Sequence, residues 1–248
     1  MKTINKLIIT LFVCLTFTPI VGQMNHQKMF ETYLTGNLTN WGKELSKIET
    51  EKNPTTQTLA DAANYTYGYI AWLIDQNKKE EAEHQMARLE TLVKQLEHRH
   101  YADSCLFYVY RSANAAYTVT LGTGKMAVNG LRAIKFCNRA VEMNANNAIA
   151  LSLKGNVDFY RPAIFGGNKK EAMKWYKKSV DAFEKQKLTT NNWNYYATML
   201  TLAQAYEKQG YIDEAIATCQ KMLKTAPTFQ YIAKEYLPTL EKKKKETK

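Results

Sequence analysis

The chain has 248 residues, of which 45% are hydrophobic, and it contains five prolines and eleven glycines. This composition excludes a low-complexity chain and suits one extended domain or two small ones. The formal net charge of +11 could indicate a nucleic-acid contact. Part of the excess lies in a lysine-rich C-terminal end, so we favour a solvated tail and expect no nucleic-acid partner.

The first residues have the pattern of a secretory signal. Lys2 and Lys6 precede an apolar run over residues 7–17, and small or turn-forming residues follow. The apolar run is shorter than the roughly twenty residues that a bilayer core requires. We therefore predict a signal peptide over 1–22, cleaved near Gly22–Gln23. The mature protein would be periplasmic or secreted and would have no transmembrane segment.

Residues 23–57 follow the leader and carry no copy of the phrase that recurs later in the chain. We expect an N-terminal helical extension there.

One phrase recurs four times after this extension, each time around an alanine that would let two helices approach closely. Apolar residues at three- and four-residue spacing place one stripe on each helix. Successive alanines lie farther apart than the about 34 residues of a regular helical-hairpin repeat, so the repeats contain insertions. The four alanines are Ala82, Ala133, Ala172 and Ala215.

The last unit, Tyr196 to Pro227, resembles the tetratricopeptide repeat. The residues that carry the resemblance are Leu202, Ala203, Tyr206, Gly210, Ala215 and Pro227, whereas Met199 and Cys219 depart from the usual aromatic residues. The resemblance implies an all-α, tetratricopeptide-like helical-hairpin solenoid with about four degenerate repeats over 58–240. A basic tail would follow over 241–248.

A breaker-rich stretch, RPAIFGGN, separates two helical patterns of the third unit. Gly-Gly before a helix could cradle a phosphate, but the stretch lacks the spacing of a phosphate loop and no strand pattern precedes it. We therefore predict a lengthened corner between the two helices of a hairpin. The stretch is also similar to exported tetratricopeptide proteins of the Bacteroidota type in its inserted-loop residues, which are Tyr160, Pro162, Ile164, Phe165, Gly166 and Gly167, and in the following Ala172.

No catalytic motif is present in the sequence. The histidines of HRH, His98 and His100, lack the i, i+4 spacing of two ligands on one helix face. Paired acids such as Glu80–Glu81 fall in first helical turns, where they complement the helix dipole. We expect no catalytic residues, no cofactor, no metal site and no enzymatic activity.

Three cysteines remain after the predicted cleavage, and each falls within an apolar helical pattern. An odd number at wide spacing is not a disulfide framework. We predict that Cys137 and Cys219 are buried and unpaired.

The repeat resemblance implies a binding groove lined by the first helix of each hairpin. We expect a scaffold or adaptor of the periplasm that binds a protein or peptide partner of the cell envelope there. The alternative is a ligand-binding helical accessory subunit of an envelope transport system, in which the helices enclose a pore. The groove candidates are Tyr67, Ala71, Val109, Ala113, Ser152, Asn156, Leu200, Gln204 and Lys208.

The repeat frame makes one quantitative prediction, at Ala215. Leucine there adds three heavy atoms to a close helix contact, and we expect a loss of about 1–3 kcal/mol in the free energy of unfolding. The matched control is Lys224→Leu, on the opposite side of the same predicted helix. Denaturant midpoints measure both, and equal stability of the two variants would show that the frame is wrong.

Overall fold

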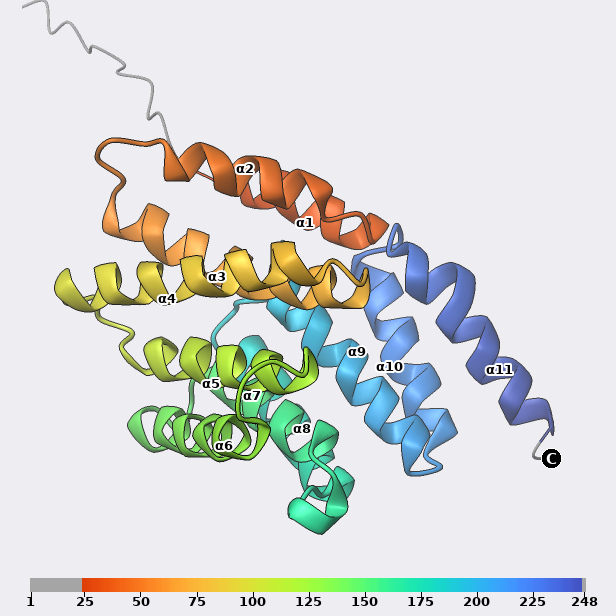
Figure 1. The fold of residues 1–248 in the computed structure, drawn as a ribbon. Helices are drawn as coiled ribbons and strands as arrows, with labels where there is room; N and C mark the ends of the chain where they lie inside the picture. The colour runs from red at the N-terminus through yellow and green to blue at the C-terminus, as the bar shows by residue number, and fades with distance from the viewer. Residues whose placement is uncertain (1–23, 247–248) are drawn as a thin grey trace, which may run out of the picture.

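The computed structural model describes residues 24–246, which form helices joined by turns and contain no β-strand (Figure 1). The predicted signal peptide, 1–22, lies outside the described residues. In chain order the elements are α1 (His26–Thr35), α2 (Thr39–Glu49), α3 (Thr56–Asp75), α4 (Lys79–His98), α5 (Cys105–Thr120), α6 (Met126–Met143), α7 (Ala148–Tyr160), the 3₁₀ turn η1 (Ala163–Phe165), α8 (Lys169–Lys185), α9 (Trp193–Lys208), α10 (Ile212–Thr225), the π-helical turn η2 (Ile232–Tyr236) and α11 (Leu237–Glu246).

Four consecutive hairpins form the body of the fold: α3 with α4, α5 with α6, α7 with α8, and α9 with α10. The four repeat alanines all lie on second helices and are buried. Ala82, Ala172 and Ala215 have no exposed surface, and Ala133 is 5% exposed. The prediction of an all-α helical-hairpin repeat fold is therefore confirmed.

Small residues and serine hydroxyls bring the paired helices close together. Ser112 Oγ on α5 donates a hydrogen bond to the carbonyl of Ala133 on α6, at 2.7 Å. Ser179 Oγ on α8 donates to the carbonyl of Ala148 on α7, at 2.6 Å. A Cβ at Gly155 would lie 2.5 Å from the ring of Tyr176, so the α7–α8 approach depends on the absence of a side chain there.

The described part of the predicted extension, 24–57, forms α1, α2 and the start of α3, and α2 packs against the first hairpin. Trp41 on α2 is fully buried. Arg88 on α4 is mostly buried and reaches α2, where its Nε lies 2.8 Å from Glu49 Oε1. Arg88 also donates to the carbonyl of Leu45. This N-terminal pair of helices is thus part of the core.

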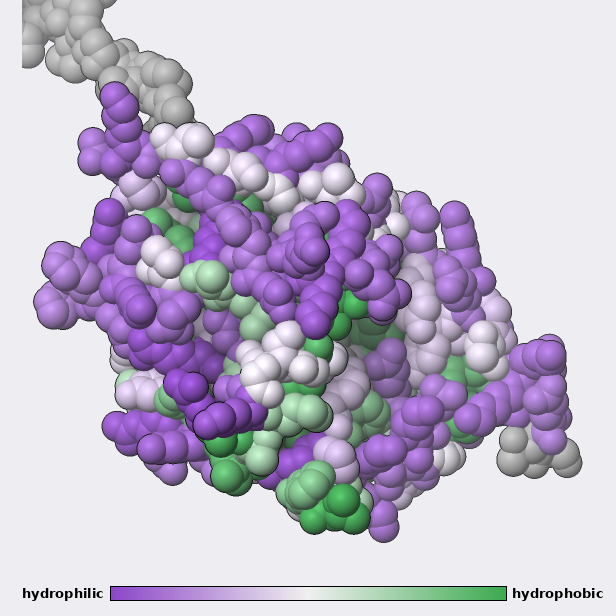
Figure 2. Space-filling model, viewed as in Figure 1, coloured by the Kyte–Doolittle hydropathy of each residue, from purple (hydrophilic) through white to green (hydrophobic). Residues whose placement is uncertain are grey.

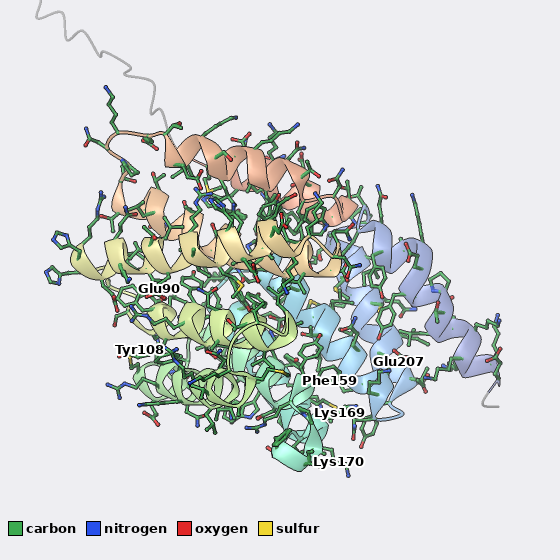
Figure 3. The ribbon with its side chains drawn as sticks, viewed as in Figure 1. Glu90, Tyr108, Phe159, Lys169, Lys170 and Glu207 are labelled. Atoms are coloured by element: carbon green, nitrogen blue, oxygen red, sulfur yellow. The ribbon has the colours of Figure 1, made fainter. Side chains whose placement is uncertain are left out.

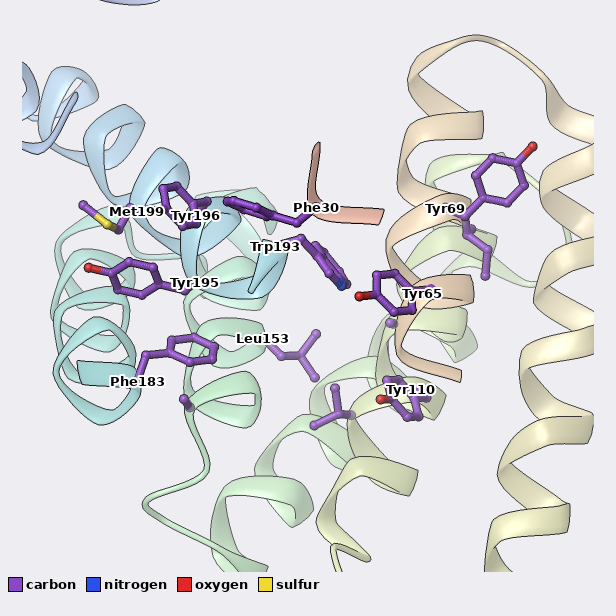
Figure 4. Close-up of a cluster of buried hydrophobic side chains, with 14 of the residues drawn as sticks. Phe30, Tyr65, Tyr69, Tyr110, Leu153, Phe183, Trp193, Tyr195, Tyr196 and Met199 are labelled. Carbon is purple, nitrogen blue, oxygen red and sulfur yellow. The ribbon is translucent and has the colours of Figure 1, made fainter. Parts of the chain in front are cut away.

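Aromatic rings join the N-terminal helices to the last hairpin. Ring centroids of Phe30 and Tyr196 are 4.9 Å apart, and those of Trp41 and Trp193 are 5.5 Å apart. Figure 4 shows Trp193 between Phe30 and Tyr65. We call these rings the closing cluster, because they link α1–α3 to α9 and the chain after α10. Its members are Phe30, Tyr33, Trp41, Tyr65, Trp193, Tyr196 and Phe229.

A polar contact reinforces the closing cluster. Asn194 Nδ2 donates to Asn64 Oδ1 at 3.0 Å, and these residues are 130 positions apart in the sequence. The first and fourth hairpins therefore touch directly, which a chain of repeats that contact only their neighbours would not allow.

The C-terminal lysines belong to a helix. The boundary predicted between 240 and 241 falls inside α11, which continues to Glu246. Lys243 Nζ lies 3.1 Å from Glu207 Oε1, and Lys244 Nζ lies 2.5 Å from Asp213 Oδ1. These ion pairs place α11 along the fourth hairpin.

Gly68 offers a test of the closing cluster. A Cβ there would lie 2.7 Å from Trp193 and 2.9 Å from Trp41. We expect Gly68→Ala to lower the free energy of unfolding by about 1–3 kcal/mol through overpacking. Urea denaturation measures the change.

The matched control is Gly130→Ala, because Gly130 also lies within a helix but has nothing within 4 Å of its added Cβ. Alanine there should stabilise the helix by up to about 1 kcal/mol. A Gly68→Ala protein as stable as Gly130→Ala would mean that the tryptophans do not meet α3 in this way.

Candidate functional site

The first helices α3, α7 and α9 surround a small hollow of about 40 Å³, which we call the inner hollow. Three of the predicted groove residues, Tyr67, Ser152 and Asn156, meet there. The structure adds residues that the sequence frame missed. The complete lining is Tyr67, Ile149, Ser152, Asn156, Trp193, Asn194, Ala197 and Thr201.

Neutral polar groups and aromatic rings define the chemistry of the inner hollow. Tyr176 donates its hydroxyl to Asn156 Oδ1 at 2.8 Å, and Thr198 donates to Ser152 Oγ at 2.8 Å. Burial raises the pKa of Tyr67 to about 12, while its hydrogen bond with Asn156 acts in the opposite direction. The Tyr67 phenol is therefore neutral near pH 7, and the hollow suits uncharged hydrogen-bonding groups.

A larger hollow of about 570 Å³ lies where the third hairpin turns, and we call it the outer hollow. It combines aromatic, cationic and amide side chains. Figure 3 shows Phe159, Lys169 and Lys170 together at this end of the molecule. Lys169 Nζ lies 5.8 Å from the Phe159 ring centroid. The lining is Phe159, Tyr160, Arg161, Pro162, Ala163, Gly167, Asn168, Lys169, Lys170 and Gln209.

The inserted loop has its shape because two glycines and one arginine fix it. Gly166 has a φ of 87°, in the left-handed region. A Cβ at Gly167 would lie 1.8 Å from the Arg161 carbonyl oxygen, so no other residue fits. The Arg161 guanidinium donates to Asp158 Oδ1 at 2.9 Å and to the Gly166 carbonyl at 2.8 Å. The inserted-loop residues Tyr160, Pro162, Phe165, Gly166 and Gly167 thus form a corner between α7 and α8.

The start of α8 is already capped by its own chain. Asn168 Oδ1 accepts from the amides of Lys170, at 3.0 Å, and Glu171, at 3.2 Å. These amides are among those that an anion at a helix N-terminus would use. The arrangement agrees with a corner rather than a phosphate cradle.

Two predicted groove residues are wrong. Val109 and Ala113 are 0% and 2% exposed, so they lie in the core. They share one stripe of α5 with Ser112, whose bond to Ala133 turns that stripe toward α6. One turn farther along the same stripe, Tyr117 donates its hydroxyl to the carbonyl of Tyr67 at 3.2 Å.

The remaining groove candidates line neither hollow. Ala71 and Lys208 are exposed, whereas Leu200 and Gln204 are half-buried on α9. The lining residues of α9 are Trp193, Asn194, Ala197 and Thr201. Trp193, Ala197 and Thr201 are spaced four residues apart and so share one face of α9. This spacing could have identified the lining face of α9 from the sequence.

Residues 24–246 contain no group of three or more His, Cys, Asp or Glu side chains that could hold a metal ion. None of their helices is both long and apolar enough to cross a membrane.

Residues 24–246 thus define an all-α protein of helical hairpins whose first helices carry the hollows. The sequence profile of the tetratricopeptide repeat family matches residues 196–229, which hold most of α9 and all of α10. No curated protein matches the chain at a significant level. Among solved structures, the HusA haemophore from Porphyromonas gingivalis is similar, with 18% sequence identity and a TM-score of 0.49 over 74% of this chain and 94% of that chain.

The buried cysteines make a prediction about reactivity. Cys105, Cys137 and Cys219 are free and buried, which confirms the expectation for the latter two. Burial raises the pKa of both Cys137 and Cys219 to about 12, so almost none of either thiol is the reactive thiolate at pH 8.

We expect iodoacetamide to leave Cys137 and Cys219 unmodified in the native protein and to label both after denaturation. A Lys224→Cys variant supplies an exposed control thiol on α10 and should react within minutes. Native labelling of Cys137 or Cys219 as fast as the control would contradict the burial.

Proposed function

We propose that the protein is a non-enzymatic, exported, tetratricopeptide-like scaffold of the Bacteroidota type that holds a protein or peptide segment of the cell envelope. One observation carries the proposal. Asn156 lines the inner hollow and Tyr160 lines the outer hollow, and they lie one helical turn apart on α7. The two hollows thus follow one line of α7, which we call the groove.

The chemistry of the groove suits a peptide. Its inner end, at about 40 Å³, has room for one small group such as a single carbonyl, which the hydroxyl and amide side chains can hydrogen-bond. Its outer end offers the ring of Phe159 for apolar or aromatic side chains. Lys169 and Lys170 at the outer end favour an acidic residue in the bound segment. The closing cluster blocks continuation beyond Trp193, so a short segment fits best.

A second function, a ligand-binding accessory subunit of an envelope transport system, is favoured by the size of the outer hollow. Its volume of about 570 Å³ lies in the range of small-molecule sites, roughly 300–1,000 Å³. Aromatic and cationic lining suits an apolar molecule that carries an acidic group. Native mass spectrometry of the purified protein distinguishes this ligand from a bound polypeptide.

Photo-crosslinking in the native cell envelope tests the proposed groove. A benzophenone amino acid replaces Tyr160, which is 65% exposed at the outer hollow, and in a second protein it replaces Lys224, exposed on α10. We expect a discrete polypeptide adduct from position 160 and none from position 224, because only the first lies in the groove.

A blocking variant completes this experiment. Thr201→Trp adds a large ring at the wall of the inner hollow and should reduce the adduct from position 160 at least about tenfold if the segment occupies that hollow. Circular dichroism and a melting curve confirm that this variant folds. Equal adducts from positions 160 and 224, or an adduct that Thr201→Trp leaves unchanged, would refute binding in the groove.

A further inference from the structure

Large apolar side chains project into solvent at two neighbouring turns. Ile164 and Phe165 in the α7–α8 loop are 86% and 69% exposed. At the start of α6, Leu131 is 70% exposed, Met126 is 55% exposed and Val128 is 49% exposed. We call these five residues the apolar tip.

The apolar tip lies on one edge of the molecule. The α5–α6 and α7–α8 turns each lead from a first helix to a second helix, so in a stack of hairpins they occupy the same edge. Figure 2 shows hydrophobic residues gathered over α6 and over the α7–α8 loop at the lower edge of this view. An exposed cluster of this kind marks a surface that docks on something else.

Basic residues surround the apolar tip, and acids are nearly absent from its sequence neighbourhood. Residues 121–135 contain three basic residues and no acidic residue. Residues 160–174 contain four basic residues and one acid, Glu171, whose carboxylate lies 2.7 Å from Lys174. On the same edge, the first and fourth hairpins carry acidic residues. Glu80 and Glu81 lie in the first turn of α4, and Asp213 and Glu214 lie in the first turn of α10.

We propose that the apolar tip docks on the surface of an anionic phospholipid bilayer. Apolar side chains on turns can enter the boundary between headgroups and acyl chains while lysine and arginine side chains stay at the phosphates. The loop backbone can lie at the bilayer surface because some of its N–H groups are hydrogen-bonded within the loop. The amides of Phe165 and Gly167 both donate to the Pro162 carbonyl.

Two observations favour a bilayer over other occupants. The tip combines exposed apolar side chains with lysines, and a bilayer accepts such a mixed surface without the matching pockets that a protein partner would have to supply. A second copy of the chain would bring Lys125, Lys169 and Lys170 of both molecules together at a two-fold contact, and like charges there are unfavourable. Glu81 and Asp213 at the starts of α4 and α10 are ion-paired with Lys78 and Lys244, so the two middle turns carry the larger basic excess of this edge.

Vesicle sedimentation tests the proposal with the chain that begins at Gln23, because the apolar leader would itself bind lipid. The probes are vesicles of equal parts phosphatidylglycerol and phosphatidylcholine, and vesicles of phosphatidylcholine alone. We expect binding to the anionic vesicles only, and weaker binding as salt is raised. The double variant Ile164→Asn, Phe165→Asn should lower the partition coefficient about tenfold or more. Lys125→Glu with Lys170→Glu should do the same.

The matched control removes exposed apolar side chains at the other edge, in Leu188→Asn with Met143→Asn, which are 48% and 38% exposed. This control should bind as the unaltered chain does. The proposal is overturned by absence of binding to anionic vesicles, by equal losses in tip and control variants, or by binding that salt does not weaken. Light scattering that shows self-association abolished by the tip variant would assign the edge to a second copy instead.

Discussion

The contact between Trp193 and the N-terminal helices determines the shape of everything else in the molecule. Trp193 begins α9, yet its ring contacts Trp41 on α2. The ring also lies so close to Gly68 on α3 that a Cβ added to this glycine would be 2.7 Å from it. This contact requires the stack of hairpins to curve until its first and fourth members touch. A residue as small as alanine at position 68 would already obstruct this contact. The curvature of the stack therefore depends on a glycine in the middle of a helix.

Closure of the stack explains the form of the groove. In an open solenoid the first helices line a long concave surface, but here α1, α2 and the closing cluster occupy one end of that surface. The remaining opening lies at the edge where α7 turns into α8, beside Tyr160 and the lysines of the outer hollow. In the groove that we propose, the two hollows follow α7 from Asn156 to Tyr160.

The repeat phrase was sufficient to predict the four hairpins, because each needs a small residue at one crossing and Ala82, Ala133, Ala172 and Ala215 supply it. The corner at Gly166 and Gly167 could also be predicted from the sequence, because glycine permits backbone conformations that other residues rarely adopt. Sequence reasoning failed where contacts are not repeated. Nothing in the periodicity indicates that Trp41 and Phe30 meet residues from the far end of the chain. Val109 and Ala113 were misplaced because the stripe of α5 that they share with Ser112 packs against α6, and spacing alone did not show which stripe of α5 faces the groove.

The bond between Asn64 and Asn194 also bears on how the chain reaches its native state. Most repeat proteins fold from local contacts, so that any stretch of a few repeats can form and grow. Here the closing cluster needs Phe229 as well as Phe30, so its core can be completed only when nearly all of the chain is available. A chain that emerges N-terminus first would pack α1 and α2 on the first hairpin but would leave their aromatic rings without Trp193, Tyr196 and Phe229 until that moment. Unfolding should accordingly behave as one cooperative transition rather than as fraying from the ends.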